Sequence, residues 1–207
     1  MARKIVFDIE TVPRPGIMDT FYPQWASAKY PEKEGQELED MAALHAEFGM
    51  ICAVAYANAL TDEPPHIYTA GSIEEEAQML ADLEHIFDNE SVTLIGHNIK
   101  GFDLPFIAKR YIAQRGYLPK TLNFAGKKPW EIPHKDTMEI LRFAGDCSMS
   151  LRSACLLLGI EDPKGSVCGS DVSQLFREGK LDIIGDYCGG DVVADRAVVR
   201  KLTEALS

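Results

Sequence analysis

Two carboxylates stand at alternate positions directly after the first apolar run of the chain. Residues 4–7 have the composition of a buried β-strand, and Asp8 and Glu10 follow them. Because residues i and i+2 of a strand point to the same face, these two side chains should lie close together. Two neighbouring anions need a cation between them, and ligands gather at the carboxyl ends of strands in open α/β sheets. The pattern predicts a strand that ends at a metal site, although acidic residues that point to water would explain this pair taken alone.

The length and composition of the chain predict one domain. The 207 residues are 46% hydrophobic, which is enough for one substantial core and does not require a second. We therefore expect a single domain over residues 1–207. The segment at about 13–45 is acidic and interrupted by prolines, so we expect it to be an insertion or a lid on that domain.

The sequence shows no sign of a membrane or of a disulfide framework. No apolar run is long enough to span a bilayer, and the first residues do not resemble a signal peptide. We expect a cytoplasmic protein without membrane contact. The cysteines are odd in number and form no CxxC pair, so we expect reduced bystanders rather than disulfides or a zinc site: Cys52, Cys147, Cys155, Cys168 and Cys188.

The net charge of −11 argues against a protein that coats duplex DNA through a broad basic surface. The charge is unevenly distributed, because residues 100–142 carry nine Lys and Arg against four Asp and Glu. This segment could follow a short stretch of phosphate backbone. A solvated basic helix face would explain it equally well.

Hydrophobic periodicity predicts strands and helices that alternate along the chain. Strands are expected at 4–7, 50–59, 66–69 and 92–95, and helices at about 37–48, 73–87, 102–115, 136–143, 151–158 and from 183 to the end. Ser72 and Ser150 are expected to cap two of these helices, and Gly159 to end one. This order predicts a mixed α/β fold around a central sheet.

A third carboxylate, Asp103, stands at the start of a helix that follows a strand. A helix N-cap is the simple explanation for an aspartate there. The start of a helix is also a favourable place for a phosphate, so an N-cap and a binding role are compatible.

A fourth carboxylate, Asp191, lies four residues after Tyr187, which puts both on one helix face. Gly189 and Gly190 stand between them and should cost a helix roughly 2 kcal/mol relative to alanine. We therefore expect something to approach the helix backbone closely there. Asp195 continues the same face and is expected to be solvated or paired with a base such as Arg196.

In this order, the segments resemble the three motifs of the DEDD superfamily of 3'-5' exonucleases, which have an RNase H-like, or DnaQ-like, fold. Residues 7–11 resemble the first motif, 98–103 the second and 187–191 the third. Tyr187 resembles the marker of the tyrosine (DEDDy) branch. The chain is similar to stand-alone bacterial relatives of the proofreading exonuclease domain of family B DNA polymerases. The similarity extends to residues 128–130, 134–137 and 150–160, and leaves out only about 13–45.

The resemblance implies an RNase H-like α/β fold with a central mixed β-sheet flanked by helices. It also implies a catalytic site with two Mg²⁺ or Mn²⁺ ions held by Asp8, Glu10, Asp103 and Asp191. Oxygen-only ligands suit such hard cations. In this scheme Asp8 bridges the ions, Glu10 and Asp191 complete the first, and Asp103 holds the second through water. Tyr187, a phenol with an ordinary pKa near 10, would orient the attacking water rather than deprotonate it.

Contacts with substrate are expected from residues near these motifs. Thr11 and Asn98 are placed to meet the 3'-terminal nucleotide, and Phe102 could stack on a base. An aromatic side chain beside a helix start packs into a core at least as often. Three other polar residues are expected not to be functional. His97 should lie in the core, Asp136 should cap a helix, and Lys164 should be solvated.

The residues and the resemblance together predict a metal-dependent 3'-5' exonuclease. Its expected partner is the 3' end of a single-stranded nucleic acid, DNA in the first place, from which it would release nucleoside 5'-monophosphates. An RNA-trimming nuclease is one alternative, because the 2'-OH is read by local shape. A non-catalytic nucleic-acid-binding or partner-docking module on the same fold is another. A replication or repair protein is the expected protein partner, with residues 13–45 as the candidate contact.

Overall fold

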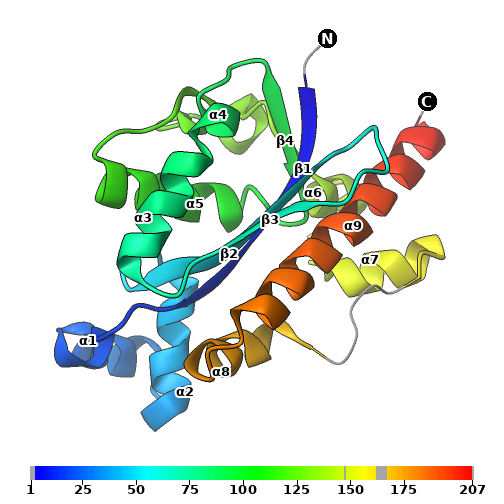
Figure 1. Cartoon of the computed structure of the whole chain (residues 1–207). Coiled ribbons are helices and arrows are strands. Elements are labelled where there is room, and N and C mark those ends of the chain that lie inside the picture. The colour runs from blue at the N-terminus through cyan, green and yellow to red at the C-terminus, as the bar shows by residue number, and fades with distance from the viewer. Residues whose placement is uncertain (1–2, 147, 162–166, 207) are drawn as a thin grey trace.

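A mixed β-sheet forms the centre of the molecule. The computed structural model describes residues 3–146, 148–161 and 167–206 (Figure 1). Its five strands lie in the order β3-β2-β1-β4-β5, with antiparallel pairing of β1 to β2 and β2 to β3, and parallel pairing of β1 to β4 and β4 to β5. The strands are β1 (Arg3–Pro13), β2 (Gly49–Asn58), β3 (His66–Thr69), β4 (Val92–Gly96) and β5 (Lys135–Asp136).

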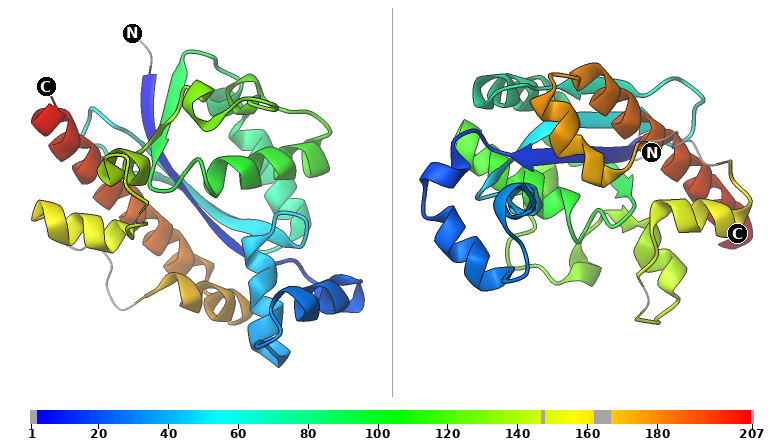
Figure 2. Two further views of the ribbon diagram at one scale, coloured as in Figure 1. Left: turned by 180° about the vertical axis from the view of Figure 1, so that it is seen from behind. Right: turned by 90° about the horizontal axis from the view of Figure 1, so that it is seen from below.

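Helices flank this sheet on both faces (Figures 1 and 2). They are α1 (Tyr22–Lys29), α2 (Gly35–Asp40), α3 (Ile73–Asp82), α4 (Glu84–Phe87), α5 (Asp103–Arg115), α6 (Thr137–Arg142), α7 (Leu151–Leu158), α8 (Val172–Arg177) and α9 (Leu181–Leu206). The described residues also form the 3-10 turns η1 (Ile17–Asp19), η2 (Met41–Leu44), η3 (Lys120–Leu122), η4 (Pro129–Glu131) and η5 (Gly169–Asp171). Within the described ranges, no helix combines the length and the apolar character that a membrane span needs.

Side chains alternate along β1 and so connect it to different helices on its two faces. On one face, the ring of Phe7 packs edge-on against Phe87 of α4 at 5.4 Å, and Phe87 packs against Tyr111 of α5 at 5.7 Å. On the other face, Asp8 contacts Cys188 of α9. The long helix α9 therefore covers the face of β1 that carries the acidic side chains.

Three of the four predicted strands and most predicted helices are confirmed within one or two residues. The strand predicted at 4–7 is longer, because β1 continues to Pro13, so Asp8 and Glu10 lie within the strand and not after its end. Ser72 and Ser150 accept hydrogen bonds from the backbone N–H of Glu75 and Ser153, both at 3.1 Å, so both predicted caps are present. Gly159 ends α7 in the left-handed region. Two long predicted helices are broken: 73–87 divides into α3 and α4, and 37–48 divides into α2 and η2.

Residues 13–45 contain η1, α1, α2 and η2, and they build a small core around Tyr22. This ring packs against Phe48 at 4.9 Å, and its hydroxyl donates to the carbonyl of Leu38. The segment is fastened to β1 because the Thr11 hydroxyl donates to the carbonyl of Ala43 at 2.7 Å. It lies at the carboxyl end of β1 (Figure 1), and its role as a lid stays a prediction.

The close approach expected at the paired glycines is present at Gly189. A Cβ on this residue would lie 2.7 Å from Cδ1 of Ile67, so the strand β3 is the neighbour that requires a glycine. Gly185, one turn earlier, meets the same strand. The glycines therefore let α9 pack closely on the sheet, and the helix runs unbroken through them.

Candidate active site

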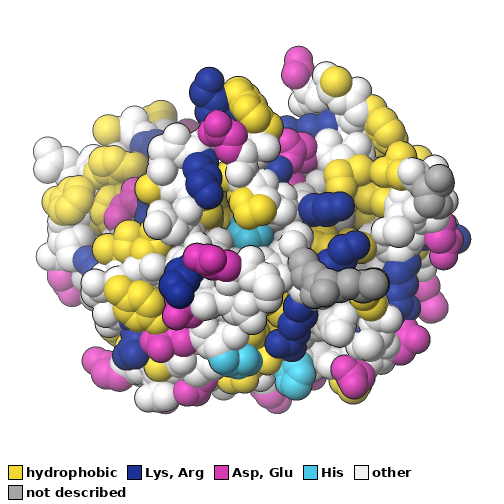
Figure 3. All heavy atoms as spheres, turned by 90° about the horizontal axis from the view of Figure 1, so that it is seen from above, with side chains coloured by type: hydrophobic (Ala, Val, Ile, Leu, Met, Phe, Trp, Pro, Cys, Tyr) yellow, Lys and Arg dark blue, Asp and Glu magenta, His cyan; other side chains and the backbone are white. Residues whose placement is uncertain are grey.

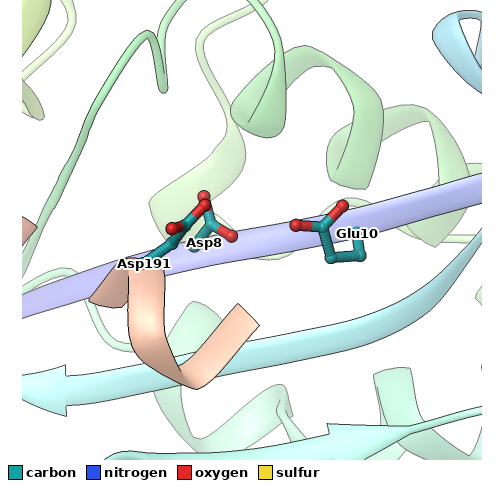
Figure 4. A group of neighbouring side chains, drawn as sticks. All are labelled: Asp8, Glu10 and Asp191. Atoms are coloured by element: carbon teal, nitrogen blue, oxygen red, sulfur yellow. The ribbon is translucent and has the colours of Figure 1, made fainter. Parts of the chain in front are cut away.

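Three carboxylates meet where α9 crosses β1. Asp8 and Glu10 project from the same face of β1, and Asp191 comes from α9 (Figure 4). Each offers an oxygen that lies within 4.8 Å of the oxygens of the other two. The i, i+2 spacing in the strand thus places both acidic residues toward the helix, as the sequence indicated.

Asp103 approaches the same place from the open edge of β1. Strand β4 pairs with β1 only as far as Val6, which leaves the later N–H groups on that side without a strand partner. Gly96 ends β4 very close to β1, since a Cβ there would lie 2.8 Å from the Phe7 carbonyl oxygen. The buried Asp103 carboxylate then accepts the N–H of Ile9 at 3.1 Å. Its side chain does not cap α5, so the simple N-cap explanation is wrong.

Burial and the neighbouring carboxylates raise the pKa of Asp8. Burial raises the pKa of Asp8 well above its usual value, and the charges of Asp103, Glu10 and Asp191 raise it further. Burial also raises the pKa of Asp103 to about 8, against the opposing effect of its backbone hydrogen bonds. Like charges at this separation are unfavourable unless a proton or a cation is shared among them.

This group of side chains fits a divalent metal. Asp8, Glu10 and Asp191 supply only carboxylate oxygens, which are the ligands that Mg²⁺ and Mn²⁺ prefer. A cation among these oxygens would also relieve the repulsion that raises the pKa of Asp8. Asp103 stands outside the group of three and influences it through its charge on Asp8.

Cys188 is a neighbour of the cluster that the sequence did not reveal. Its Sγ lies 3.5 Å from both the backbone carbonyl and Oδ2 of Asp8 and is fully buried. No disulfide joins the described cysteines Cys52, Cys155, Cys168 and Cys188, whereas Cys147 lies outside the described residues. Cys188 packs directly against Asp8, a contact that the expectation of bystander cysteines did not include. Its position three residues before Asp191 was the available signal.

Tyr187 lies one turn before Asp191 on α9 and packs partly against the main core. Its hydroxyl lies 3.8 Å from the position that a Cβ on Gly169 would take, so it is close to η5. Whether this hydroxyl orients a water stays a prediction. Lys164, in the segment that precedes η5, lies outside the described residues.

The three candidate substrate contacts lie around the cluster in different settings. Thr11 is buried, and its hydroxyl donates a hydrogen bond to the Ala43 carbonyl. Asn98 adopts a left-handed backbone with φ 61° just before α5, a conformation that Asn tolerates. Phe102 is partly buried and packs against Phe106 with ring centroids 5.5 Å apart. Their contacts with a nucleotide stay predictions.

Asp136 holds the turn that leads to Asp103. Its carboxylate caps α6 by accepting the N–H groups of Met138 and Glu139, as predicted. It also accepts the N–H groups of Asn98 and Lys100, at 3.0 and 3.1 Å. The residue expected only to cap a helix therefore also positions the second motif.

Asp195 corrects an expectation. It is buried, accepts the Thr137 hydroxyl at 2.7 Å, and its Oδ2 has no hydrogen-bond partner among the described residues. Arg196 donates instead to the Glu63 carbonyl. Asp195 is therefore neither solvated nor paired with Arg196. His97 is half-buried and contacts Thr137 Oγ1 and the Met149 carbonyl, which agrees with a structural role.

Comparison with known proteins gives a family match for this chain and solved structures with a similar fold. The family described as "Predicted 3'-5' exonuclease related to the exonuclease domain of PolB" matches residues 42–201. The match includes Asp103, Tyr187 and Asp191, whereas Asp8 and Glu10 precede it. A comparison with curated proteins gave no match.

Two solved structures are similar in fold. One is the family B DNA polymerase from the hyperthermophilic archaeon Pyrobaculum calidifontis, with a TM-score of 0.58 and 15% identity over 100% of this chain and 24% of that one. The other is E. coli Exonuclease I in complex with a dT13 oligonucleotide, with a TM-score of 0.55 and 12% identity over 99% of this chain and 41% of that one. The chain thus spans less than half the length of either. The predicted RNase H-like fold is confirmed.

These findings agree with the superfamily that the motifs indicated, while the tyrosine branch stays a prediction. The family match covers most of the sequence and includes the helix that carries Asp191. The chain belongs to the family of predicted 3'-5' exonucleases related to the exonuclease domain of PolB.

Proposed function

We propose that this protein is a divalent-metal-dependent 3'-5' exonuclease of the tyrosine branch. It hydrolyses the terminal phosphodiester bond of single-stranded nucleic acid, DNA in the first place, and releases nucleoside 5'-monophosphates. The observation that carries the proposal is the group of Asp8, Glu10 and Asp191 oxygens within 4.8 Å of one another. The family match and the fold shared with an exonuclease in complex with an oligonucleotide support it.

Each of the four carboxylates has a proposed role that follows from its position. Asp8, Glu10 and Asp191 would hold the metal, and Asp103 contributes a further carboxylate from the edge of β1. Two Mg²⁺ or Mn²⁺ ions bound there would activate water and stabilise the departing 3' oxygen. Asp8 is central because the charges of all three other carboxylates act on it.

Side chains around the carboxylates orient the reactants. Tyr187 supplies a hydroxyl one turn before Asp191 for positioning the water that attacks phosphorus. Asn98 and Phe102 flank the start of α5, where a helix N-terminus favours a phosphate group. Asp136 fixes this turn by accepting two of its backbone N–H groups.

The test uses 5'-labelled DNA and RNA oligomers with Mg²⁺, Mn²⁺ or EDTA. A matched oligomer with a phosphorothioate at its 3'-terminal linkage reports the direction of cleavage. The proposal predicts a ladder that shortens from the 3' end, requires the metal and is slowed by the blocked end.

Other outcomes separate the alternatives. Trimming of RNA alone would replace DNA by RNA as the substrate. Binding of both oligomers without cleavage under any metal condition would contradict the exonuclease and favour a non-catalytic binding module on this fold.

A further inference from the structure

The exposed lysines of the basic segment 100–142 that form no ion pair among the described residues lie in or beside one loop. Four of its nine basic residues form ion pairs with acidic side chains: Lys100 with Glu139, Lys109 with Glu47, Arg110 with Glu76, and Arg115 with Glu84. Four exposed lysines form no ion pair among the described residues: Lys120, Lys127, Lys128 and Lys135. On the face shown in Figure 3, basic side chains lie among acidic and hydrophobic ones over much of the surface.

The Trp130 loop, residues 121–134, presents an aromatic ring among these lysines. Trp130 is 73% exposed, although indole rings usually find cover in folded proteins. The ammonium of Lys128 lies 5.1 Å from the centre of its ring. Lys127 is exposed beside it. An open π-face beside positive charge is the arrangement with which proteins hold single-stranded nucleic acid.

Both ends of the Trp130 loop are fixed. Buried His134 accepts the Leu94 N–H of β4 through Nδ1, so its Nε2–H donates to the Thr121 carbonyl at the other end of the loop. Within η4, the Glu131 carboxylate accepts the N–H of Lys128 at 2.7 Å. The exposed ring therefore stands on an ordered turn, which lowers the entropy lost when a base stacks on it.

The Trp130 loop is also joined to the turn that enters the candidate active site. The ammonium of Lys100 donates to the carbonyl of Pro129, the residue before Trp130, at 3.2 Å. Lys100 precedes Asp103 by three residues, and Asp136 holds its N–H. The Trp130 loop is therefore joined by a hydrogen bond to the segment that leads to Asp103.

We infer that Trp130 is a stacking platform for an upstream base of a single-stranded nucleic acid whose 3' end lies at the carboxylate cluster. Lys127 and Lys128 contact the neighbouring phosphates. This inference rests on the proposed function for the position of the 3' end. Nucleic acid is favoured over a protein partner because the four lysines stand against a single acidic residue, Glu131, between positions 120 and 135 of a chain with net charge −11.

The test measures oligothymidylate binding in EDTA, where no cleavage occurs, by Trp130→Ala, Trp130→Phe and wild-type protein. Stacking worth about 1–3 kcal/mol per base predicts that Trp130→Ala weakens binding by about 5- to 150-fold. Trp130→Phe should recover most of the affinity. Phe143→Ala is the matched control, because Phe143 is equally exposed at 72% and should not affect binding.

The lysines give a second readout. Lys127→Ala and Lys128→Ala should each reduce the dependence of log Kd on log salt concentration by about 0.7, the value for one phosphate contact of a single strand. Lys201→Ala removes an exposed lysine of α9 and should leave the dependence unchanged. In the cleavage assay, Trp130→Ala should raise KM for long oligomers and leave a dinucleotide unaffected.

The outcomes distinguish this inference from the proposed function. Binding by Trp130→Ala at wild-type strength, or no binding by the wild type, would overturn the platform while leaving cleavage of short substrates open to its own test. Binding that depends on Trp130 in a protein that cleaves nothing would support the platform and contradict the exonuclease.

Discussion

The thiol of Cys188 lies 3.5 Å from Oδ2 of Asp8, which makes a residue of α9 a direct neighbour of the central carboxylate. The same sulfur lies 3.5 Å from the Asp8 backbone carbonyl. The helix that brings Asp191 to the cluster is thus held against β1 by a small buried side chain. The distance between the helix and the strand at this point determines how closely the carboxylates approach.

Enlarging Cys188 should therefore disturb the site. Cys188→Val adds bulk to a fully packed position, which we expect to cost about 1–3 kcal/mol in the free energy of unfolding and to displace Asp8. Urea unfolding and oligomer trimming measure the two effects. Cys168→Val, at an exposed thiol, is the control. Full activity in Cys188→Val would show that the contact does not set the position of Asp8.

Asp136→Asn should weaken the turn before α5. Oδ2 of Asp136 accepts the Lys100 N–H. An amide NH₂ in place of Oδ2 is a donor, so it would face the N–H donor of Lys100 and the hydrogen bond would be lost. We expect a loss of about 1–3 kcal/mol in stability. We also expect slower trimming, because the turn leads to Asp103. Asp146→Asn, an exposed aspartate, should change neither quantity. Unaltered trimming in Asp136→Asn would contradict its positioning role.

Glu76→Ala should destabilise the fold without affecting the metal site. The Glu76 carboxylate is fully buried and accepts hydrogen bonds from Arg110, Gln114 and the Ile51 N–H. Its removal leaves the Arg110 guanidinium buried without its counterion, which costs about 3–5 kcal/mol. Chemical denaturation should show this loss, with Glu74→Ala on the exposed side of α3 near wild type. A loss below 1 kcal/mol, on the order of a surface pair, would contradict the account.

Asp195 should make stability depend on pH. Burial raises its pKa to about 7, against about 3.9 in an unfolded chain. Because the folded state favours the protonated form, the stabilisation is complete below about pH 4 and is lost as the pH rises through 7. The Asp195 contribution should fall by up to roughly 3 kcal/mol between pH 5 and pH 8.

Asp195→Asn removes this titration while keeping the shape of the side chain. Measured with saturating Mg²⁺, its stability should decline less between pH 5 and pH 8 than that of the wild type. Asp182→Asn, an exposed residue of the same helix, should decline like the wild type. Equal declines in all three proteins would show that Asp195 does not titrate in this range.

The parts of the fold that local rules determine could be predicted from the sequence. The period of two in β1 places Asp8 and Glu10 on one face, and serine caps fix the starts of α3 and α7. The strand β5 could not be predicted, because it has only two residues, too few to show a period, and α8 was also missed.

The parts of the site that depend on distant segments were also missed. Asp103 accepts the Ile9 N–H because β4 ends at Gly96 and leaves the edge of β1 open. No local sequence pattern predicts where β4 stops pairing with β1. The contact of Cys188 with Asp8 joins residues 180 positions apart. Asp195 was expected to be solvated because charged side chains are rarely buried without a partner, yet it lies on the buried stripe of α9.

The most direct test of the account compares Asp191→Asn with Asp186→Asn in Mn²⁺ binding and in the trimming of a 5'-labelled oligothymidylate. Asp191 belongs to the carboxylate cluster, whereas Asp186 is an exposed aspartate of the same helix. The account predicts that Asp191→Asn binds Mn²⁺ more weakly and that its trimming rate falls by at least about a hundredfold. Changing a metal ligand should reduce the rate at least as much as changing a residue that only orients a ligand. Asp186→Asn should behave like the wild type. Metal-dependent trimming that persists in Asp191→Asn at the wild-type rate would contradict the central claim that these carboxylates form the hydrolytic site.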